Sequence, residues 1–412
     1  MTPQAIALQR LQRVATVLGP GMVVMLADTD AGSVITAAQS GAQWGYRLLL
    51  LQFLLVPLLY IVQELTVRLA LHTGLGYGEL IRQQLGRAMG YVALATLAIS
   101  CFGALATEIS GLTGAGQALG IAPWETITSV CVLIMAMVLT GSYRSVERAA
   151  LAIGAFELAF LLVAWHAHPD MHVIRAQLFE MPLRNHDYLY LLAANLGTSV
   201  MPWTVFYQQS ALIDKGVGPD GLKEARADTL LGAMFCQLIT AAVLIAAAAL
   251  NGSAAGHVLD NVQEIAVAFT HVLGPAAGTW LFVLALSGGA LVATIVVCLT
   301  VAWALGEVSG KRHSLAAHPL EAPWFYGAFG LMLLGSGLLV GSGVNLVRLM
   351  LATGVVNAVL LPVVLGFLFW LAWRALPPAH RLRGGHALAV ALLFALTSML
   401  GLYTGIQGAF GS

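Results

Sequence analysis

Long apolar segments with few charged residues recur along most of this 412-residue sequence. A helix needs about 20 mostly apolar residues to cross a bilayer. Eleven segments meet this requirement: residues 14–40, 46–71, 90–119, 124–141, 146–166, 187–213, 226–250, 275–306, 323–342, 345–375 and 386–407. Only 9% of the residues are charged, against about 25% in soluble proteins. Because lipid offers the backbone no hydrogen-bond partners, we predict an all-α polytopic membrane protein.

The basic residues predict the orientation of these spans, because Lys and Arg gather in cytoplasmic loops. With the N-terminus in the cytoplasm and the loops alternating, 15 of the 19 Lys and Arg residues fall on the cytoplasmic side and the C-terminus lies outside. The stretch before the first span shows no small-residue cleavage site, so we expect that span to be retained. The zero net charge argues against a nucleic-acid partner. Compact loops and short termini favour a bacterial inner membrane.

The first span contains a polar stretch at the depth of the bilayer centre. Asp28, Thr29, Asp30, Gly32 and Ser33 follow one another within six residues of an otherwise apolar segment. A charge at this depth is costly, so it indicates a substrate or ion pathway. The glycine and the short polar side chains favour an interrupted helix, which is tolerated only where the backbone lines a cavity or is buried in protein.

A second interruption is predicted in the sixth span, where Gly197 and Pro202 bracket a polar stretch. Proline inside a helix removes a hydrogen bond and clashes with the preceding turn. The two broken spans are five apart, which is typical of a transporter with five plus five spans in an inverted repeat. We therefore predict one transporter domain over residues 1–412, with the first repeat at 14–166, the second at 187–375 and an additional helix at 386–407.

The chemistry of the two breaks favours a divalent cation. A carboxylate from Asp30 and free backbone carbonyls suit such an ion, and the thioether of Met201 suits a softer one such as Mn²⁺, Fe²⁺ or Cd²⁺ rather than Mg²⁺ or Ca²⁺. The alternative for Met201 is core packing, the usual role of methionine. The residue type leaves both interpretations open.

Four stretches resemble the Nramp family of divalent-metal transporters. Residues 19–21 (Gly-Pro-Gly), 30–33 (Asp-Ala-Gly-Ser) and 41–46 (Gly-Ala-Gln-Trp-Gly-Tyr) are similar to the family's first span, which carries Asp-Pro-Gly-Asn and a Gly-Ala-x-x-Gly-Tyr stretch. Residues 197–203 (Gly-Thr-Ser-Val-Met-Pro-Trp) resemble its sixth-span Gly-Ala-Thr-Val-Met-Pro-His. The resemblance implies a LeuT-type fold and metal import coupled to protons. The metal ligands that it implies are the Asp30 carboxylate, the Ser33 side chain, the Met201 sulfur and carbonyls near Ala27 and Thr198.

The sequence departs from the family pattern at positions of metal binding or proton coupling. Ala31 stands where the family has a proline, and Ser33 stands where it has an asparagine. Trp203 stands where the family has its sixth-span histidine. Leu360 falls where the family has a tenth-span glutamine. These differences support a second hypothesis, in which the fold is kept and the pocket takes Mg²⁺, a trivalent ion or a small organic solute with weak or no proton coupling. A third hypothesis is a membrane sensor that does not transport.

Further acidic residues within the spans have two interpretations each. Asp28 could converge with Asp30 as an added metal ligand that also binds a proton, or it could face a water-filled vestibule or cap the second half-helix. Glu108 matches one of two proton-conducting acids of the family, whereas Gly111 stands where the other would be; alternatively, Glu108 only hydrogen-bonds a neighbouring helix. Glu157 has no family counterpart that we can name.

Several other features have structural interpretations. Glu64 and Arg68, four residues apart near the end of the second span, form a predicted ion pair. Residues 259–273 have apolar positions at helical spacing, which predicts an amphipathic helix on the outer face. His166, His168 and His172 could collect a metal in the outer loop, but solvated histidines are the preferred interpretation. The four cysteines all lie in apolar segments and are expected to be buried without metal or disulfide.

The leading hypothesis is a secondary transporter that imports Mn²⁺ or Fe²⁺ by alternating access, coupled to protons. In this hypothesis Asp30 binds the ion, protonation of Asp30 competes with it, and Glu108 passes the proton inward. The ion and protons are substrates, so no cofactor is expected, and the remaining partner is the lipid bilayer. We expect a monomer. No nucleophile elbow, zinc-protease helix or phosphate-binding glycine loop occurs in the sequence, so an enzyme is not expected.

Overall fold

The structure is a computed structural model. It describes residues 19–140, 152–251, 274–311 and 318–410, with a few positions between 259 and 270, and its elements are helices. The first half contains α2 (Pro20–Asp28), α3 (Ala31–Trp44), α4 (Leu49–Thr73), α5 (Tyr77–Leu85), α6 (Arg87–Ala118), α7 (Pro123–Thr140), η1 (Ala155–Leu158), α9 (Ala159–His166) and α10 (Met171–Gln177). The second half contains α11 (His186–Ser199), α12 (Pro202–Asp214), η2 (Pro219–Gly221), α13 (Leu222–Asn251), α15 (Pro275–Ser309), α16 (Pro323–Gly341), α17 (Leu346–Arg374) and α18 (Gly384–Phe410).

The predicted spans are present as helices. In the described part of the chain, eight helices are long and apolar enough to cross a membrane, and two bent pairs raise this number to ten. One pair is α2 with α3, bent by 47°, and the other is Ala152–His166 with α10, bent by 103°. The predicted fourth span holds a shorter apolar helix, Pro123–Leu139. Helix therefore occurs in all eleven predicted ranges, and the all-α polytopic class is confirmed.

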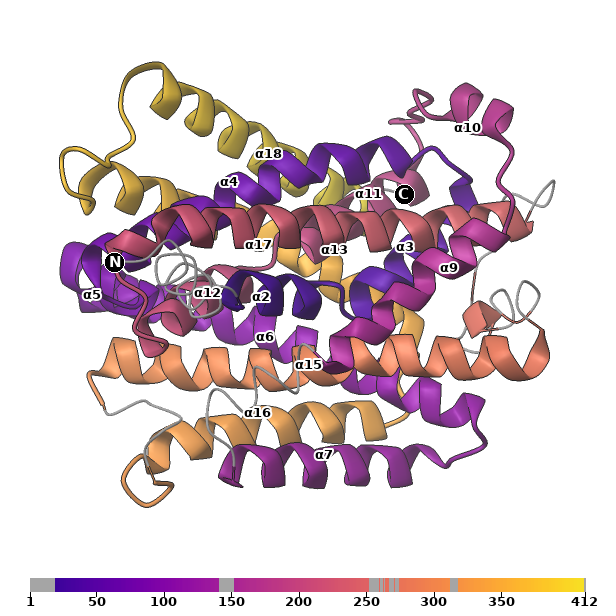
Figure 1. Ribbon diagram of the computed structural model, residues 1–412, viewed down its shortest axis with the longest axis horizontal. Coiled ribbons are helices and arrows are strands. Elements are labelled where there is room, and N and C mark those ends of the chain that lie inside the picture. The colour runs from indigo at the N-terminus through magenta and orange to yellow at the C-terminus, as the bar shows by residue number, and fades with distance from the viewer. Residues whose placement is uncertain are drawn as a thin grey trace, which may run out of the picture.

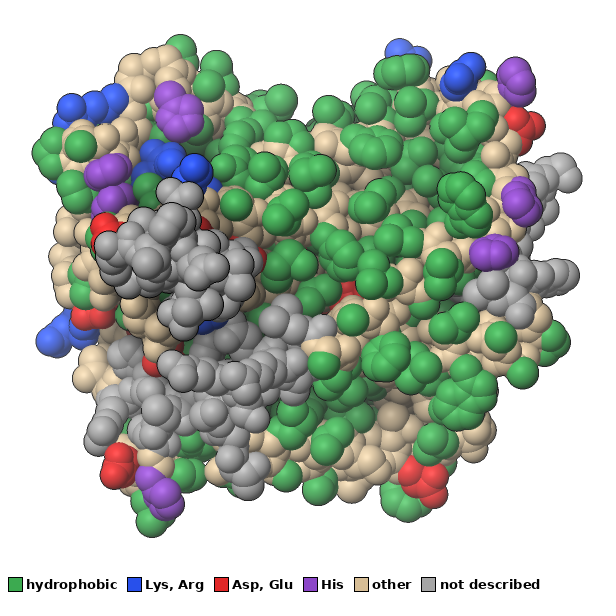
Figure 2. All heavy atoms as spheres, viewed as in Figure 1, with side chains coloured by type: hydrophobic (Ala, Val, Ile, Leu, Met, Phe, Trp, Pro, Cys, Tyr) green, Lys and Arg blue, Asp and Glu red, His purple; other side chains and the backbone are tan. Residues whose placement is uncertain are grey.

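The helices run roughly along the long axis of the molecule (Figure 1). Nearly all residues of the four short helices α2, α3, α11 and α12 are buried. In the view of Figure 1, α18 lies along one edge and α7 with α16 along the opposite edge. Basic and histidine side chains gather at the two ends of this axis, and hydrophobic side chains cover the face between them (Figure 2). A hydrophobic face between two polar ends is the kind of surface that a bilayer requires. We refer to the two ends as the α5 end and the α10 end.

Close helix packing fixes the second break against its neighbour. A Cβ at Gly197 of α11 would lie 1.8 Å from the carbonyl oxygen of Gly354 in α17, so only glycine permits this approach. Small residues at such contacts are how helices pack in membranes, where van der Waals contact replaces the hydrophobic effect. The contact holds α11 firmly on the long helix α17.

The predicted ion pair of Glu64 and Arg68 is confirmed and extended. Arg68 Nη2 lies 2.5 Å from Glu64 Oε2, and Arg226 Nη2 of α13 lies 2.6 Å from Glu64 Oε1. The pair therefore joins α4 to the start of α13 at the α5 end. The four cysteines are buried and free, as expected.

Much of the predicted amphipathic helix at 259–273 lies outside the described residues. Its described apolar positions Leu259, Val262, Ile265 and Ala266 are buried. The Leu259 backbone N–H donates to Gln39 Oε1 of α3 at 3.1 Å. The apolar face of this segment is thus turned into the protein.

Candidate functional site

The first break separates α2 from α3 by two residues. Thr29 ends α2, and Asp30 has an extended backbone before α3 begins. Asp30 Oδ1 accepts a hydrogen bond from the backbone N–H of Ser33 at 2.7 Å, so this carboxylate is the N-cap of α3. Aspartate is a favoured N-cap because it satisfies an N–H that lacks a partner in the helix. The side chain that sequence analysis selected as the main ligand therefore also starts the second half-helix.

A second carboxylate completes the start of α3. Glu108 of α6 accepts a hydrogen bond at Oε2 from the backbone N–H of Ala31, with a length of 3.1 Å. The Glu108 side chain also forms a hydrogen bond with the Asp30 carboxyl group. Two buried acids thus meet the positive end of one half-helix, where negative charge is stabilised by the helix dipole.

The second break lies between α11 and α12. α11 ends at Ser199, and Met201 has an extended backbone immediately before Pro202 opens α12. Proline fits the first helical position, where its missing N–H is not needed. The Met201 side chain is buried, with only 2% of the residue exposed. The break therefore places a thioether within the protein interior.

Ser33 joins the two breaks. Its hydroxyl Oγ lies 2.8 Å from the main-chain oxygen of Asp28 and 3.2 Å from the main-chain oxygen of Thr198. The first acceptor belongs to the last turn of α2 and the second to the last turn of α11. The last carbonyls of a helix lack partners within it, so both are available to a polar group between the half-helices. Ser33 thus brings together the carbonyl ends that the sequence predicted to face a cation.

Trp203 holds the sulfur of Met201. The indole Nε1–H of Trp203 donates to Met201 Sδ at 3.2 Å, and the indole is fully buried. Sulfur has more than one lone pair, so this contact leaves it able to act as a ligand. The aromatic ring occupies the position at which the sequence comparison expected a histidine. It supplies a fixed hydrogen bond where a histidine would supply a titratable group.

The remaining predicted ligands have different surroundings. Ala27 is buried in the last turn of α2, so its carbonyl belongs to the same end as that of Asp28. The Asp28 carboxylate contacts α13, where the Cys236 thiol lies 3.6 Å from Oδ2. Asp28 is fully buried and therefore faces no water-filled vestibule, and the residue that caps α3 is Asp30, not Asp28. Whether Asp28 reaches the same ion as Asp30 stays a prediction.

Packing explains why no second acid lies on α6 beside Glu108. A Cβ at Gly111 would lie 2.3 Å from the Ala31 Cβ at the start of α3. Any side chain at position 111 would push α6 away from the first break. The absence of a side chain at Gly111 is therefore what allows Ala31 in the first break to pack against α6.

Two buried groups near the breaks were not predicted. Asp228 of α13 accepts hydrogen bonds at Oδ2 from the backbone N–H groups of Gly19 at 3.2 Å and Gly21 at 2.7 Å, which fixes the start of α2. Asn195 of α11 donates to Ser40 Oγ of α3 at 2.8 Å and accepts from Gln52 Nε2 of α4 at 2.7 Å. An isolated polar residue within an apolar span was the only signal for either one.

The histidine loop does not form a cluster. His166 Nδ1 lies 2.9 Å from the carbonyl oxygen of Leu162, and the His172 backbone N–H donates to Asp170 Oδ1. Only His168 and Asp170 share a hollow of about 210 Å³ at the α10 end. Among the described residues, no three His, Cys, Asp or Glu side chains are grouped to hold a metal. The ligands predicted at the breaks are of other types, namely the Asp30 carboxylate, the Ser33 hydroxyl, the Met201 thioether and backbone carbonyls.

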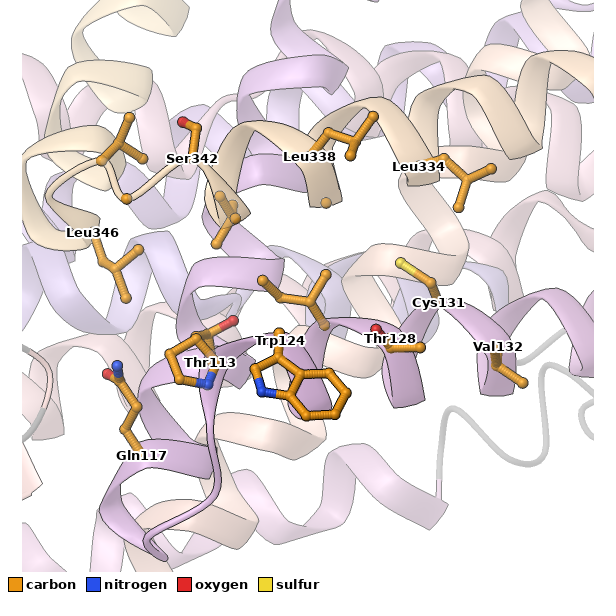
Figure 3. A pocket seen from close by; sticks show the side chains of 17 residues that line it. Thr113, Gln117, Trp124, Thr128, Cys131, Val132, Leu334, Leu338, Ser342 and Leu346 are labelled. Carbon is orange, nitrogen blue, oxygen red and sulfur yellow. The ribbon is translucent and has the colours of Figure 1, made fainter.

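A wide hollow lies apart from the breaks. It has a volume of about 980 Å³ and is lined by α6, α7, α16 and the start of α17. Figure 3 shows Trp124, Thr128 and Val132 of α7 facing Leu334 and Leu338 of α16. Its apolar walls suit hydrocarbon rather than an ion.

Comparison with known proteins agrees with the motifs at the two breaks. The family model described as natural resistance-associated macrophage protein-like, Nramp, matches residues 21–407. The chain belongs to the Nramp family. The divalent metal cation transporter MntH 1 of Pseudomonas aeruginosa is 30% identical over 287 residues, which are 65% of this chain and 63% of that protein. The MntH of Deinococcus radiodurans is 29% identical over 301 residues, 68% of this chain and 66% of that protein. The chain thus spans a little under two thirds of these relatives.

Solved structures give the same fold. A manganese transporter of Eremococcus coleocola superposes with a TM-score of 0.77 at 18% identity, covering 97% of this chain and 88% of that one. MhsT in complex with L-phenylalanine superposes with a TM-score of 0.61 at 15% identity, covering 95% and 98%. The LeuT-type fold predicted for this Nramp-family chain is confirmed. Within that fold, Ser33 contacts the carbonyl ends at both breaks, and Trp203 donates a hydrogen bond to Met201 at the second break.

Proposed function

We propose that this Nramp-family chain is a secondary transporter that carries divalent transition metal ions, Mn²⁺ or Fe²⁺, inward by alternating access. One observation carries the proposal: Ser33 joins two half-helix ends, and Asp30 and Met201 lie beside these ends on opposite breaks. A carboxylate with carbonyls binds divalent cations, and a thioether favours the softer ones. The curated relatives named divalent metal cation transporters, and the solved manganese transporter, support the same substrate class.

The proposed ligands are the side chains of Asp30, Ser33 and Met201 with the carbonyls of Ala27 and Thr198. Binding requires the Ser33 hydroxyl to turn an oxygen lone pair toward the ion while its hydrogen stays on a carbonyl. The metal is cargo, so the proposal includes no resident cofactor and no catalysed reaction. Asp28 is an additional negative charge on the α13 side of the break.

Asp30 and Glu108 form the proposed proton path. Both carboxylates lie at the start of α3. Asp30 accepts a hydrogen bond from the Ser33 N–H, and Glu108 accepts one from the Ala31 N–H. A proton on Asp30 removes the charge that attracts the ion, so protonation and metal binding compete. The Asp30 and Glu108 side chains are hydrogen-bonded to each other, which supports direct passage of a proton between them.

Alternating access requires contacts that release at each end. At the α5 end, Asp228 holds the start of α2 through Gly19 and Gly21. At the α10 end, Asn195 links α11 to α3 and α4. We propose that the α5 end is cytoplasmic and that these two contacts break in alternate states. The proposed setting is a bacterial inner membrane, with the N-terminus inside, the C-terminus outside, a monomer in the bilayer and no nucleic-acid partner.

Radioactive Mn²⁺ uptake into proteoliposomes tests the proposal. Asp30→Ala removes the only carboxylate proposed as a ligand, and uptake should fall by more than about 100-fold. Asp187→Ala, an exposed acid at the start of α11, is the matched control and should transport normally. Unchanged uptake by a folded Asp30→Ala protein would contradict the proposal.

A second candidate function follows from the internal contacts of two ligands. Ser33 Oγ is occupied by carbonyls, and Met201 Sδ accepts from Trp203. If both contacts persist during transport, Asp30 and carbonyls alone remain, which suits Mg²⁺, a trivalent ion or a small organic solute. Uptake of Mg²⁺ but not Mn²⁺ by the wild-type protein would identify this alternative.

A further inference from the structure

Two arginines share one carboxylate at the α5 end. Glu64 of α4 accepts hydrogen bonds from Nε and Nη2 of both Arg68 and Arg226. Two positive charges therefore meet one negative charge, and one positive charge is left over. The Arg68 side chain is only 11% exposed, whereas the Arg226 side chain is 40% exposed. Lys223 and Glu224, just before Arg226 at the start of α13, offset one another. The surplus charge is thus presented to the surroundings by Arg226.

The loop between α17 and α18 adds positive charge at the same place. Arg68 Nη1 donates to the carbonyl oxygen of His380 at 3.2 Å, and the His380 ring stacks on that of His72 with 3.8 Å between the ring centroids. Arg381 and Arg383 follow His380 in this loop, and no acidic residue occurs from the start of α16 to the end of the sequence. The loop therefore carries only positive charge, and basic and histidine side chains lie side by side at this end of the molecule (Figure 2).

An apolar stripe runs along α13 from Arg226. It consists of Leu230, Met234 and Leu238, which follow Arg226 at intervals of four residues and are 39%, 52% and 52% exposed. Residues four apart are neighbours on a helix surface. At 1.5 Å per residue the distance from Arg226 to Leu238 is about 18 Å, a little more than half of the roughly 30 Å hydrocarbon core of a bilayer. The α13 stripe therefore has the depth of one leaflet, with positive charge at its polar end.

We propose that an anionic phospholipid binds here, with its phosphate on Arg226 and the α17–α18 loop and an acyl chain along the α13 stripe. A guanidinium group can donate two parallel hydrogen bonds to a phosphate, and basic pockets between membrane helices bind anionic headgroups. A soluble anion would leave the stripe unused, and a zwitterionic lipid would bring its own positive charge to the arginines. The inference goes beyond the proposed function, because no proposed metal ligand takes part in the site.

Native mass spectrometry of the purified full-length protein in neutral detergent tests this site. Phosphatidylglycerol and phosphatidylcholine with identical acyl chains are added separately, and the wild type should bind phosphatidylglycerol at least about tenfold more tightly. Arg226→Gln should weaken phosphatidylglycerol binding by about fivefold, the contribution of one basic residue near an anionic lipid. Arg383→Gln, which lies outside the Glu64 pair, should have a similar effect. Arg348→Gln removes an exposed arginine at the start of α17 and is the matched control, which should bind like the wild type.

Two further measurements identify the occupant. Met234→Gln, which places an amide in the α13 stripe, should weaken phosphatidylglycerol binding, and millimolar inorganic phosphate should leave the lipid bound. Displacement of the lipid by inorganic phosphate would show a site for soluble anions and would overturn the proposal.

Equal binding of the two lipids, or wild-type affinity in a folded Arg226→Gln protein, would also overturn the proposal, because the protein would then contact only bulk lipid. Melting temperatures without added lipid show whether each variant is folded, and Arg383→Gln decides the question if Arg226→Gln is not. Failure of Mn²⁺ uptake with intact phosphatidylglycerol binding would contradict only the proposed function.

Discussion

The two breaks differ in what they contribute to the interior. The first, at Thr29 and Asp30, is surrounded by the carboxylates of Asp28, Asp30 and Glu108, and a side chain caps the helix that follows it. The second, at Met201, has no side-chain cap and begins its helix with proline. The first break therefore concentrates negative charge, and the second supplies a soft donor and a rigid support. A cation between the two breaks would be attracted by the carboxylates of the first break. The thioether of the second break would favour softer cations over Mg²⁺ or Ca²⁺.

The largest expected effect concerns the support of the second break. Gly197→Ala places a methyl group 1.8 Å from the Gly354 carbonyl oxygen, so α11 and α17 must separate. We expect a loss of about 3 kcal/mol in the free energy of unfolding, seen as a lower melting temperature in detergent. Gly366→Ala, in open space on the same long helix, should melt like the wild type. Equal melting temperatures for both variants would show that the second break is not rigidly held.

The next effect concerns the charge at the first break. Glu108→Gln can still accept the Ala31 N–H but cannot carry a proton, so the fold should be kept. We expect Mn²⁺ uptake to slow by about tenfold and to lose its response to a pH gradient, with equilibrium Mn²⁺ binding nearly unchanged. Uptake driven by a pH gradient at the wild-type rate would remove Glu108 from the proton path.

A smaller effect should come from the indole beside Met201. Trp203→Phe keeps the aromatic bulk and removes the N–H that donates to Sδ. Because a hydrogen bond of this kind contributes about 0.5–1 kcal/mol, the freed sulfur should bind Mn²⁺ about threefold more tightly. Calorimetric titration measures this change. Weaker binding would mean that the indole positions the sulfur rather than competing with the ion.

The sequence was sufficient to predict the spans and both breaks. Their signals are local: apolar length, Gly197 and Pro202 in the sixth span, and acids within the first. Asp30 could be selected because a charge at the depth of the bilayer centre is costly. For Met201 the residue type left core packing equally open, and the resemblance to the Nramp sixth span selected it as a ligand. The position of a residue along a span determines the helix end on which it lies. The sequence was therefore sufficient to assign these two residues to the two breaks.

The contacts around the breaks could not be predicted, because they depend on how distant helices pack. Nothing in the sequence indicates that Asp228 meets the start of α2, or that Trp203 donates to its near neighbour Met201. The reason for glycine at position 111 appears only when Ala31 is seen against it. Side-chain direction and helix approach, rather than residue type, decide these contacts.

The most direct test of the account is calorimetric titration of the purified protein with Mn²⁺ and separately with Mg²⁺, repeated on Met201→Ala. We predict that Mn²⁺ binds and that loss of the sulfur weakens Mn²⁺ binding by about tenfold, or about 1.4 kcal/mol. The titration with Mg²⁺ should be the same for the wild type and for Met201→Ala. Met181→Ala, a methionine exposed outside the helices, should bind Mn²⁺ like the wild type. No heat with Mn²⁺, or equal binding of both ions with no effect of Met201→Ala, would contradict a transition-metal site between the two breaks.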